Sequence, residues 1–306
     1  MSILVAVTSR FLELQLAALR ELAPQERFFT DPYGAVSDAV EVIVAYRLAA
    51  GIAPRFPGLR FVAAPGAGVD ELLAGDIPQR VPIVRALDPT QGHRMAQYVA
   101  LMVLRWQRAL PRLEAQHRKG EWRRFAPDEE RTVGVMGCGW IGSQVVATLR
   151  ILGFPVVVWA RSPRAIEGVE CFAGATGLGA FLARSQALVC TVPLTPDTQG
   201  LLCAKTLALL PRGAYLVNVS RGGLLVEADL LAAIESGQIA GAALDVFATE
   251  PLPPDSPLWR REEILCTPHV AAAPRPDIVG RQVLENLRRA RRGEPLLNAV
   301  DRNRGY

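Results

Sequence analysis

Cysteine, histidine and long apolar runs are all scarce in this chain of 306 residues. Its five cysteines form no C-x-x-C pair, and their odd number argues against a disulfide framework, so we expect reduced thiols in a cytoplasmic protein. Only three histidines occur, none with a cysteine at ligand spacing, and we therefore expect no metal site. No uncharged apolar run approaches about 18 residues, and no segment has the form of a secretory signal, so we expect neither a membrane span nor secretion.

The charge of the chain is nearly balanced, with 34 basic and 30 acidic residues and a formal net charge of +4. This excess is too small and too scattered to predict a nucleic-acid partner. Half of the residues are hydrophobic, which is ample for a core, and the length exceeds that of most single-core proteins. We therefore expect a globular protein of two domains.

The most informative stretch of the chain is the segment from Thr132 to Gly142. A short apolar strand is expected at 133–136 and a helix at 143–152, and between them stand three glycines in the spacing G-x-G-x-x-G: Gly137, Gly139 and Gly142. The first glycine permits a tight turn, the second leaves room for phosphates, and the third lets the helix approach the strand. Backbone N–H groups and the helix dipole then point at a pyrophosphate. We predict a dinucleotide site here, with Trp140 and Ile141 among its residues.

The end of the next strand, expected at 155–159, bears on the choice of cofactor. NAD sites usually place a carboxylate there to accept hydrogen bonds from the ribose hydroxyls, but here no carboxylate occurs before Glu167. Two arginines and a serine stand in its place: Arg161, Ser162 and Arg164. Guanidinium groups suit the 2′-phosphate of NADP, so we expect NADP to be favoured over NAD. The alternative is that both arginines are solvated surface residues.

Strands and helices alternate along both halves of the chain, which implies parallel sheets. Short buried strands are expected at 3–7, 42–46, 61–64, 83–84, 133–136, 155–159, 188–192, 215–219, 241–246 and 264–267. Helices are expected at 11–22, 95–108, 143–152, 227–236 and 276–292. Pro111 is expected to kink or end the second of these helices, and a polar connection at 118–130 follows it.

The final helix follows the last strand of the second alternating unit, and we expect it to cross back onto the first unit. One domain would then cover residues 1–97 plus 277–306, and the other would cover residues 98–276.

Polar side chains with catalytic potential follow three of the later strands. They are Arg221, the pair Asp245 and Glu250, and His269. The carboxyl ends of parallel strands open on one edge of a sheet, where ligands bind in open α/β folds. We therefore expect Arg221, Glu250 and His269 to converge at one site despite their distance in sequence.

Together with the glycine loop, these strand ends resemble the D-isomer-specific 2-hydroxyacid dehydrogenase family, and most closely its glyoxylate/hydroxypyruvate reductase A subgroup. Further matching stretches stand in the order of that family: Gly66–Asp70, Met95–Tyr98 and Glu250–Pro253. The resemblance spans nearly the whole chain. It implies an α/β fold of two doubly wound parallel-sheet domains, a flavodoxin-like substrate domain and a Rossmann nucleotide-binding domain, with a cleft between them.

The resemblance also implies a reaction, the NADPH-dependent reduction of small 2-oxo acids to D-2-hydroxy acids. His269 would be the general acid in this direction and the base in the reverse, and Glu250 would hold its ring. Arg221 would bind the substrate carboxylate and polarise the carbonyl, because its planar fork matches a carboxylate beside a ketone oxygen. The other carboxylate oxygen would be bound by the backbone N–H groups of a glycine turn, those of Ala67, Gly68 and Val69.

The same resemblance assigns the surroundings of the nicotinamide. Its ring would be lined by His269 and by three residues at strand ends: Val192, Pro193 and Val219. Thr198 would reach the phosphates. Asp245 would face the nicotinamide amide, although an aspartate at a strand end is also a common helix cap.

Substrate choice is expected to depend on the first domain. The subgroup tends to have a tryptophan just after its second strand, where this chain has Ala45 and Tyr46, followed by Arg47. Loss of the indole would leave more room, and Arg47 or Arg275 would attract a second anionic group. We therefore expect hydroxypyruvate or another larger 2-oxo acid to be reduced at least as well as glyoxylate.

Partners other than a 2-oxo or 2-hydroxy acid are implied only by the resemblance. It points to a homodimer formed through the helix at 95–108 and its polar continuation, although the apolar side of that helix could equally be buried within one subunit. A function of another class also stays open, namely a binding protein that senses the nicotinamide dinucleotide with little turnover. Following NADPH absorbance with a panel of 2-oxo acids separates the two.

Overall fold

The computed structural model describes residues 2–7, 9–35, 37–126 and 130–305. The chain forms two compact units, Met1–Thr90 with Ala273–Tyr306, and Gln91–Ala272. The boundaries expected from the sequence, after residues 97 and 276, lie a few residues later. The first difference arises in helix α3 (Pro89–Gln107), because its Met95 and Ala96 already pack into the hydrophobic core of the second unit.

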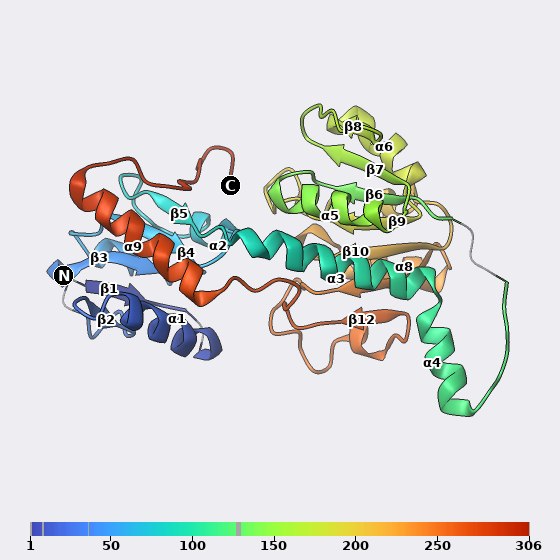
Figure 1. Ribbon diagram of the computed structural model, residues 1–306, viewed down its shortest axis with the longest axis horizontal. Coiled ribbons are helices and arrows are strands. Elements are labelled where there is room, and N and C mark those ends of the chain that lie inside the picture. The colour runs from blue at the N-terminus through green and yellow to red at the C-terminus, as the bar shows by residue number, and fades with distance from the viewer. Residues whose placement is uncertain (1, 8, 36, 127–129, 306) are drawn as a thin grey trace. The chain divides into compact units, whose positions relative to one another are not determined.

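The first unit is built on a five-stranded parallel sheet in the order β2-β1-β3-β4-β5 (Figure 1). Its strands are β1 (Ser2–Val5), β2 (Arg27–Phe29), β3 (Val40–Val44), β4 (Phe61–Ala64) and β5 (Ile83–Arg85). Its helices are α1 (Ser9–Leu22), α2 (Asp70–Leu73) and α9 (Pro276–Arg292), with short 3-10 turns η1 (Ser37–Ala39) and η2 (Ala53–Arg55). Helices α1 and α9 pack together and cover one face of the sheet. The strand order is that of flavodoxin-like folds.

The second unit is built on a seven-stranded parallel sheet in the order β12-β11-β10-β9-β6-β7-β8 (Figure 1). Its strands are β6 (Val133–Met136), β7 (Val156–Ala160), β8 (Glu170–Ala173), β9 (Ala187–Cys190), β10 (Ala214–Asn218), β11 (Ile239–Leu244) and β12 (Ile264–Cys266). Its helices are α3, α4 (Leu110–Lys119), α5 (Trp140–Ile151), α6 (Gly174–Arg184), α7 (Ala204–Leu207) and α8 (Glu227–Glu235), with 3-10 turns η3 (Gly222–Leu224) and η4 (Pro257–Arg260). Residues of α3 and α5 cover one face, and residues of α6, α7 and α8 cover the other.

The direction in which successive strands are added to this second sheet reverses at β6. From β6 the chain builds β7 and β8 on one side and then returns to place β9 on the other side of β6. Ligands of doubly wound sheets bind at the carboxyl edge where the order reverses. The glycine loop directly follows β6, so the sequence motif and the topology identify the same edge. The expected fold class is confirmed by this pair of parallel sheets.

Several expected elements have the bounds found in the structure, namely the strands at 61–64 and 133–136 and the helix at 276–292. The sequence reading missed β8 and α6. Strand β8 lies at the edge of its sheet with no fully buried residue, and α6 contains three glycines in eleven residues, which lowers its helix propensity. We find no candidate for a membrane span among the described helices.

The prediction for the long helix was wrong at its start, whereas its end at Gln107 lies next to the expected end at Arg108. Helix α3 begins at Pro89 because Asp88 caps it: Asp88 Oδ1 accepts hydrogen bonds from the N–H and the hydroxyl of Thr90, at 2.8 and 2.7 Å. The helical conformation is interrupted at Ala109, which has a left-handed φ of 48°. Pro111 lies in the first turn of the next helix, α4, and does not end α3. The polar connection therefore begins only after α4, and its residues 127–129 lie outside the described part of the chain.

Candidate active site

Three neighbouring strands of the second unit bring the expected catalytic side chains to one edge. Arg221, Glu250 and His269 follow β10, β11 and β12, which lie side by side in the sheet. Glu250 Oε2 lies 2.8 Å from His269 Nδ1. An ionised carboxylate only accepts hydrogen bonds, so Nδ1 is the donor of this pair. The other ring nitrogen of His269, Nε2, is then the one that can exchange a proton with a ligand.

Glu250 is held in place from both of its oxygens. While Oε2 pairs with His269, Oε1 accepts a hydrogen bond from the Phe247 N–H at 3.0 Å. Burial acts to raise the pKa of Glu250, but the hydrogen bond and charge of His269, the Phe247 N–H and the charge of Arg221 outweigh it. The pKa therefore lies below its ordinary value, and Glu250 is ionised at neutral pH.

Arg221 is half-buried, and a buried asparagine at the end of β10 holds its backbone in place. Asn218 is fully buried; its Nδ2 donates to the Arg221 carbonyl at 3.1 Å and its Oδ1 accepts from the Ser220 N–H at 3.2 Å. The Arg221 guanidinium itself donates to the Ser220 carbonyl at 2.8 Å. These contacts fix the turn that carries the guanidinium. The charge of this guanidinium helps to lower the pKa of Glu250.

His269 sits on a strained turn that Asp245 holds. Its φ of 53° is left-handed, a conformation that a non-glycine residue adopts only at a cost of about 1–2 kcal/mol. The His269 N–H donates to the Asp245 carbonyl at 2.9 Å. The Asp245 carboxylate accepts from the hydroxyl of Thr267 (2.6 Å) and from the N–H groups of Val270 and Ala271 (2.9 Å each). The structure thus places the Asp245 carboxylate against this loop.

The glycine loop has the form of a phosphate cradle. Gly137 has a φ of +102°, and a β-carbon on Gly142 would lie 2.0 Å from the Gly137 carbonyl oxygen, so both glycines are required by the fold. A β-carbon on Gly139, in contrast, would meet no atom within 4 Å. No side chain caps the start of α5 at Gly139, and within the described residues we find no acceptor for the N–H groups of Cys138 and Gly139. This open, donor-lined turn fits a pyrophosphate.

The residues expected to select the cofactor follow β7. Arg161, Ser162 and Arg164 are all exposed. Burial raises the pKa of the Cys138 thiol, and the charge of Arg164 acts to lower it. The Arg164 guanidinium therefore lies near the glycine loop, which contains Cys138. The residues present therefore fit a dinucleotide whose ribose carries an additional phosphate.

The residues expected around the nicotinamide lie at the ends of β9 and β10. Val192 and Val219 are buried, and the Val192 carbonyl accepts a hydrogen bond from the Ser220 hydroxyl, while Pro193 is exposed. The hydroxyl of Thr198 donates to the Pro193 carbonyl at 2.8 Å and accepts from the Thr195 N–H at 2.8 Å. Thr198 thus closes the turn that follows β9. Trp140 is 41% exposed and Ile141 is half-buried at the start of α5.

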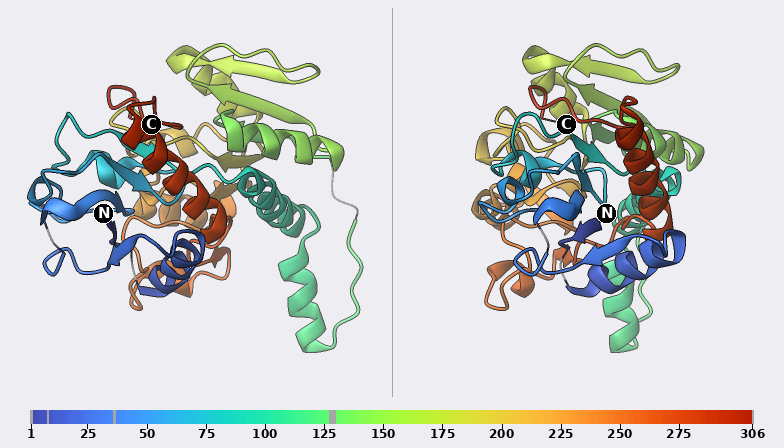
Figure 2. Two further views of the ribbon diagram at one scale, coloured as in Figure 1. Left: turned by 60° about the vertical axis from the view of Figure 1, so that its left-hand side comes forward. Right: turned by 90° about the vertical axis from the view of Figure 1, so that its left-hand side faces the viewer.

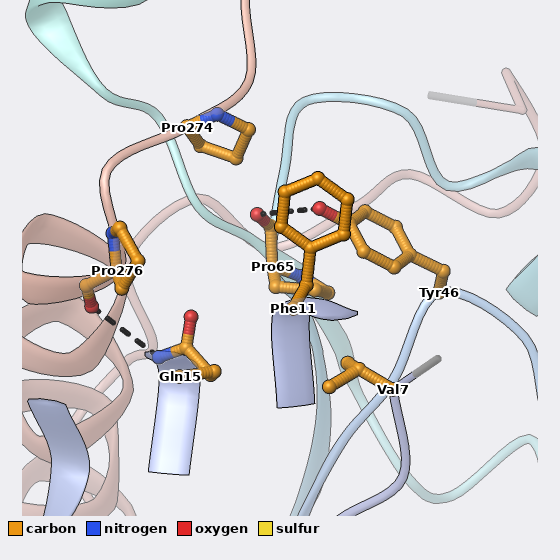
Figure 3. Close-up of a pocket in the computed structure, with 7 residues that line it drawn as sticks. All are labelled: Val7, Phe11, Gln15, Tyr46, Pro65, Pro274 and Pro276. Carbon is orange, nitrogen blue, oxygen red and sulfur yellow. Dashed lines mark hydrogen bonds between the residues drawn. The ribbon is translucent and has the colours of Figure 1, made fainter. Parts of the chain in front are cut away.

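In the first unit, the expected carboxylate-binding turn joins β4 to α2. In the described part of the chain we find no acceptor for the N–H groups of Ala67, Gly68 and Val69. Beside this turn lies a small recess lined by side chains from α1, from the loops after β1, β3 and β4, and from the segment before α9 (Figure 3). The Tyr46 hydroxyl donates to the Pro65 carbonyl across it at 3.4 Å, and the Tyr46 ring lies against Gly66 at the start of the turn.

The two arginines expected to attract a second anionic group differ in their surroundings. Arg47 is exposed in the loop that follows β3. Arg275 pairs with both oxygens of Asp277, at 3.1 Å each, and its N–H donates to Asp88 at 3.0 Å. The Asp277 carboxylate neutralises the Arg275 charge, so Arg47 is the better placed of the two to meet an anion.

Sequence reasoning missed two side chains that contact the His269 loop from α3. The Tyr98 hydroxyl lies 2.6 Å from Thr267 Oγ1, and Gln91 Nε2 donates to the Ala272 carbonyl at 2.8 Å. A tyrosine on the apolar side of a helix is normally assigned to the core. The seven-residue spacing of Tyr98 from Gln91, which places both on one helical face, is the signal that could have paired them.

Residues 100–271 match the family model of the NAD binding domain of D-isomer specific 2-hydroxyacid dehydrogenases. The glyoxylate/hydroxypyruvate reductase A of Escherichia fergusonii is 40% identical over 256 residues, which cover 81% of this chain and 82% of that protein.

Several solved structures are similar over the full length, among them two that contain NADPH or NADP. A D-isomer specific 2-hydroxyacid dehydrogenase from Xanthobacter autotrophicus Py2, in complex with NADPH and MES, has a TM-score of 0.91 and 40% identity, covering 100% of this chain and 99% of that one. An NADPH-dependent glyoxylate/hydroxypyruvate reductase from Sinorhizobium meliloti, in complex with NADP and sulfate, has a TM-score of 0.92 and 37% identity, covering 100% of both chains.

Proposed function

We propose that this chain, which belongs to the D-isomer specific 2-hydroxyacid dehydrogenase family, reduces small 2-oxo acids to D-2-hydroxy acids with NADPH. The observation that carries the proposal is the 2.8 Å contact between Glu250 and His269 at the sheet edge shared with Arg221. A carboxylate behind an imidazole and a guanidinium beside it are what a proton transfer to a carbonyl next to a carboxylate requires.

In the proposed mechanism, His269 delivers the proton. When bound, the nicotinamide supplies the hydride that reaches the carbonyl carbon of the substrate. The carbonyl oxygen takes its proton from Nε2 of His269, and Glu250 holds Nδ1 so that the ring is oriented for the transfer. Arg221 binds the substrate carboxylate and polarises the carbonyl, which orients it toward the imidazole.

The preference for NADPH is supported by the residues that follow β7. Arg161, Ser162 and Arg164 stand where NAD enzymes usually carry a carboxylate, and all three are exposed and able to contact a 2′-phosphate. The similar enzymes from Xanthobacter autotrophicus and Sinorhizobium meliloti were crystallised with NADPH and NADP. NADH is the less favoured cofactor in this proposal.

The substrate carboxylate is proposed to bind the N–H groups of the turn at 67–69, for which the described residues offer no acceptor. Next to this turn, Ala45 stands where the subgroup tends to carry a tryptophan, and Arg47 is exposed nearby in the chain. We therefore propose that hydroxypyruvate or a larger 2-oxo acid is reduced at least as well as glyoxylate. An enzyme that reduces glyoxylate alone would refute this assignment.

We also propose that two copies associate through α4 and the connection that follows it. Helix α4 has no buried residue and projects away from the sheet of its own unit (Figure 2). Leu113 on this helix is 39% exposed, and Trp122 just after it is 90% exposed. Exposed large apolar side chains of this kind commonly mark a protein interface. Light scattering of the wild type should give about twice the 33.2 kDa mass of one chain. The Trp122→Ala variant should dissociate more readily, so on dilution its measured mass should fall toward that of one chain.

The direct test is the loss of NADPH absorbance with a panel of 2-oxo acids. We expect His269→Ala to lose about 10²–10⁴-fold in kcat with little change in NADPH affinity, because it removes only the proton donor. Arg221→Ala should lose both kcat and substrate affinity. Tight NADPH binding by the wild type without reduction of any acid on the panel would instead favour a protein that senses the dinucleotide.

A further inference from the structure

We infer that Tyr98 is a positioning residue for His269, because its hydroxyl begins a hydrogen-bond chain through Thr267 to Asp245 that holds the loop carrying the imidazole. The inference concerns a residue of α3 that lies outside the group of Arg221, Glu250 and His269. The contacts are observed in the fold whatever the activity. Only the expected change in the kinetics rests on the proposed function.

The direction of the hydrogen bonds follows from the number of protons available. The Asp245 carboxylate is an acceptor, so the single hydroxyl proton of Thr267 is donated to Asp245 Oδ1, at 2.6 Å. Thr267 Oγ1 then has only lone pairs to offer to the Tyr98 hydroxyl, which lies 2.6 Å away. Tyr98 must therefore donate, and each member of the chain is fixed by the next.

The surroundings of Tyr98 keep it in the protonated, donating form. Burial raises the pKa of Tyr98 to about 12, and the nearby Asp245, Tyr215 and Cys266 act in the same direction, against the hydrogen bond of Thr267. The hydroxyl thus remains a donor over the whole range in which an enzyme of this kind works.

The loop is anchored at both of its ends to the same helix. Gln91 and Tyr98 are seven residues apart, which is two turns, so they project from one face of α3. Tyr98 contacts Thr267, the first residue after β12, and Gln91 Nε2 donates to the Ala272 carbonyl at 2.8 Å. Because Val99 and Val103 of α3 are fully buried in the core of the unit, this helix is a rigid support.

The loop needs such support because it is strained. His269 has a left-handed φ of 53°, which persists only where surrounding contacts enforce it. Removal of the Tyr98 hydroxyl leaves Thr267 Oγ1 without its donor and frees the Thr267 side chain to rotate away from Asp245. The turn can then relax, and the imidazole loses its alignment with Glu250. Arg221 and the glycine loop are on other segments and keep their geometry, so proton transfer should suffer more than binding.

The test is Tyr98→Phe, which removes one oxygen and keeps the ring. We expect kcat to fall about tenfold, while the KM for the 2-oxo acid and the Kd for NADPH stay within about twofold. The upper limb of the profile of kcat against pH should move to lower pH, because the imidazole is held less well by Glu250. Thr267→Val should show the same changes, Thr267→Ser should restore activity, and the double variant should be no worse than Thr267→Val alone.

The matched control is Tyr215→Phe. Tyr215 is also buried in this unit, burial raises its pKa to about 12, and its hydroxyl is not hydrogen-bonded to the His269 loop. We expect the kcat and the pH profile of this variant to equal those of the wild type. An unchanged kcat and pH profile in Tyr98→Phe, or equal losses in both tyrosine variants, would overturn the inference.

Hydrogen exchange of residues 267–272 provides a readout that does not depend on turnover. We expect faster exchange of the Val270 and Ala271 amides in Tyr98→Phe, and unchanged exchange in Tyr215→Phe. If the wild type reduces no 2-oxo acid, the proposed function fails while this measurement still tests the positioning of the loop. Unchanged exchange in Tyr98→Phe would reject the positioning role whatever the activity.

Discussion

Gly222 lies so close to the backbone of Phe247 that a β-carbon on it would be 1.8 Å from the Phe247 carbonyl carbon. The turn that carries Arg221 therefore rests directly on the segment that leads to Glu250. No other residue type can occupy position 222 without moving one of these two segments. The close approach explains why Arg221 and Glu250 lie near enough for the arginine to lower the pKa of the carboxyl.

Gly222→Ala is expected to damage both the fold and the site. The added methyl group must displace the backbone at Phe247, so we expect a loss of about 1–3 kcal/mol in the free energy of unfolding, and a loss of kcat as Arg221 shifts. Denaturant unfolding and steady-state kinetics measure the two effects. Gly179→Ala is the control: a β-carbon there meets no atom within 4 Å in helix α6, so it should stabilise the protein by about 0.5–1 kcal/mol.

Gly139→Ala is expected to separate cofactor binding from folding. Because its β-carbon would meet only open space, the melting temperature should change little, whereas the Kd for NADPH should rise about tenfold or more. Gly142→Ala should instead lower stability directly, since its β-carbon would lie 2.0 Å from a carbonyl oxygen. Thermal unfolding should therefore distinguish the two variants, since only Gly142→Ala should lower the melting temperature, while cofactor titration measures the loss of NADPH binding in Gly139→Ala. Unchanged NADPH binding in Gly139→Ala would remove this glycine from the phosphate site.

Arg164→Gln is expected to change the cofactor preference. Loss of the guanidinium removes a charge-assisted contact to the 2′-phosphate, so kcat/KM with NADPH should fall about tenfold while kcat/KM with NADH stays within about twofold. The control is Arg184→Gln, another exposed arginine of the same unit, which is paired with Glu170 at 3.0 Å. If kcat/KM falls equally with NADPH and NADH, Arg164 does not contact the 2′-phosphate.

The stability of the protein should depend on Glu250 in a pH range set by its lowered pKa. A carboxyl whose pKa in the folded state lies below its ordinary value of 4.5 stabilises the folded state above pH about 4.5, and the stabilisation is lost as the pH falls through the folded-state value. The difference in unfolding free energy between the wild type and Glu250→Gln should therefore be full at pH 7 and shrink below pH about 4.5. Denaturant titrations at several pH values measure it; a difference that grows in acid would contradict the sign.

Arg291→Met is expected to destabilise the first unit. The Arg291 guanidinium lies 2.8 Å from Glu26 and 2.7 Å from Glu41, whose side chains are about nine-tenths buried. Burial acts to raise the pKa of Glu41, but hydrogen bonds from Arg291 and Arg60 outweigh it, so the carboxyl remains ionised and would lose a buried partner. We expect a loss of about 2–4 kcal/mol in the free energy of unfolding.

The control for this prediction is a second arginine of helix α9. Arg288 is largely exposed and pairs with Glu285 three residues earlier, so Arg288→Met should cost less than about 1 kcal/mol. Equal losses in the two variants would mean that the network at Glu41 contributes no more than an ordinary surface ion pair.

The parts of the site that follow strand ends could be predicted from the sequence. The glycine loop, Arg221, Glu250 and His269 each stand just after an apolar run, and parallel sheets bring such positions to one edge whatever the length of chain between them. The pairing of Arg275 with Asp277 is a contact between residues two positions apart, which the sequence could also have revealed. The start of α3 at Asp88 and Pro89 is a similar case, since this dipeptide is a common helix start.

The supports of the site could not be predicted in the same way. Tyr98 and Thr267 are 169 residues apart, and a tyrosine on the apolar side of a helix is normally assigned to the core. The hydrogen-bonding end of such a side chain depends on which strand end packs against the helix, and no periodicity in the sequence specifies that. The same holds for Gly222, whose necessity arises from the Phe247 backbone 25 positions away in the chain.

The sequence by itself determined the alternation of strands and helices, although not elements such as β8 and α6, together with the phosphate-binding turn and the types of side chain available for chemistry, because these depend on residues that are neighbours along the chain. Only the tertiary structure decided which nitrogen of His269 faces Glu250, which contacts hold Asp245 and Tyr98 to the His269 loop, and which glycines have no room for a side chain. Those features are contacts between segments far apart in sequence, and their hydrogen bonds and close approaches exist only once the sheet of the second unit and its helices are packed.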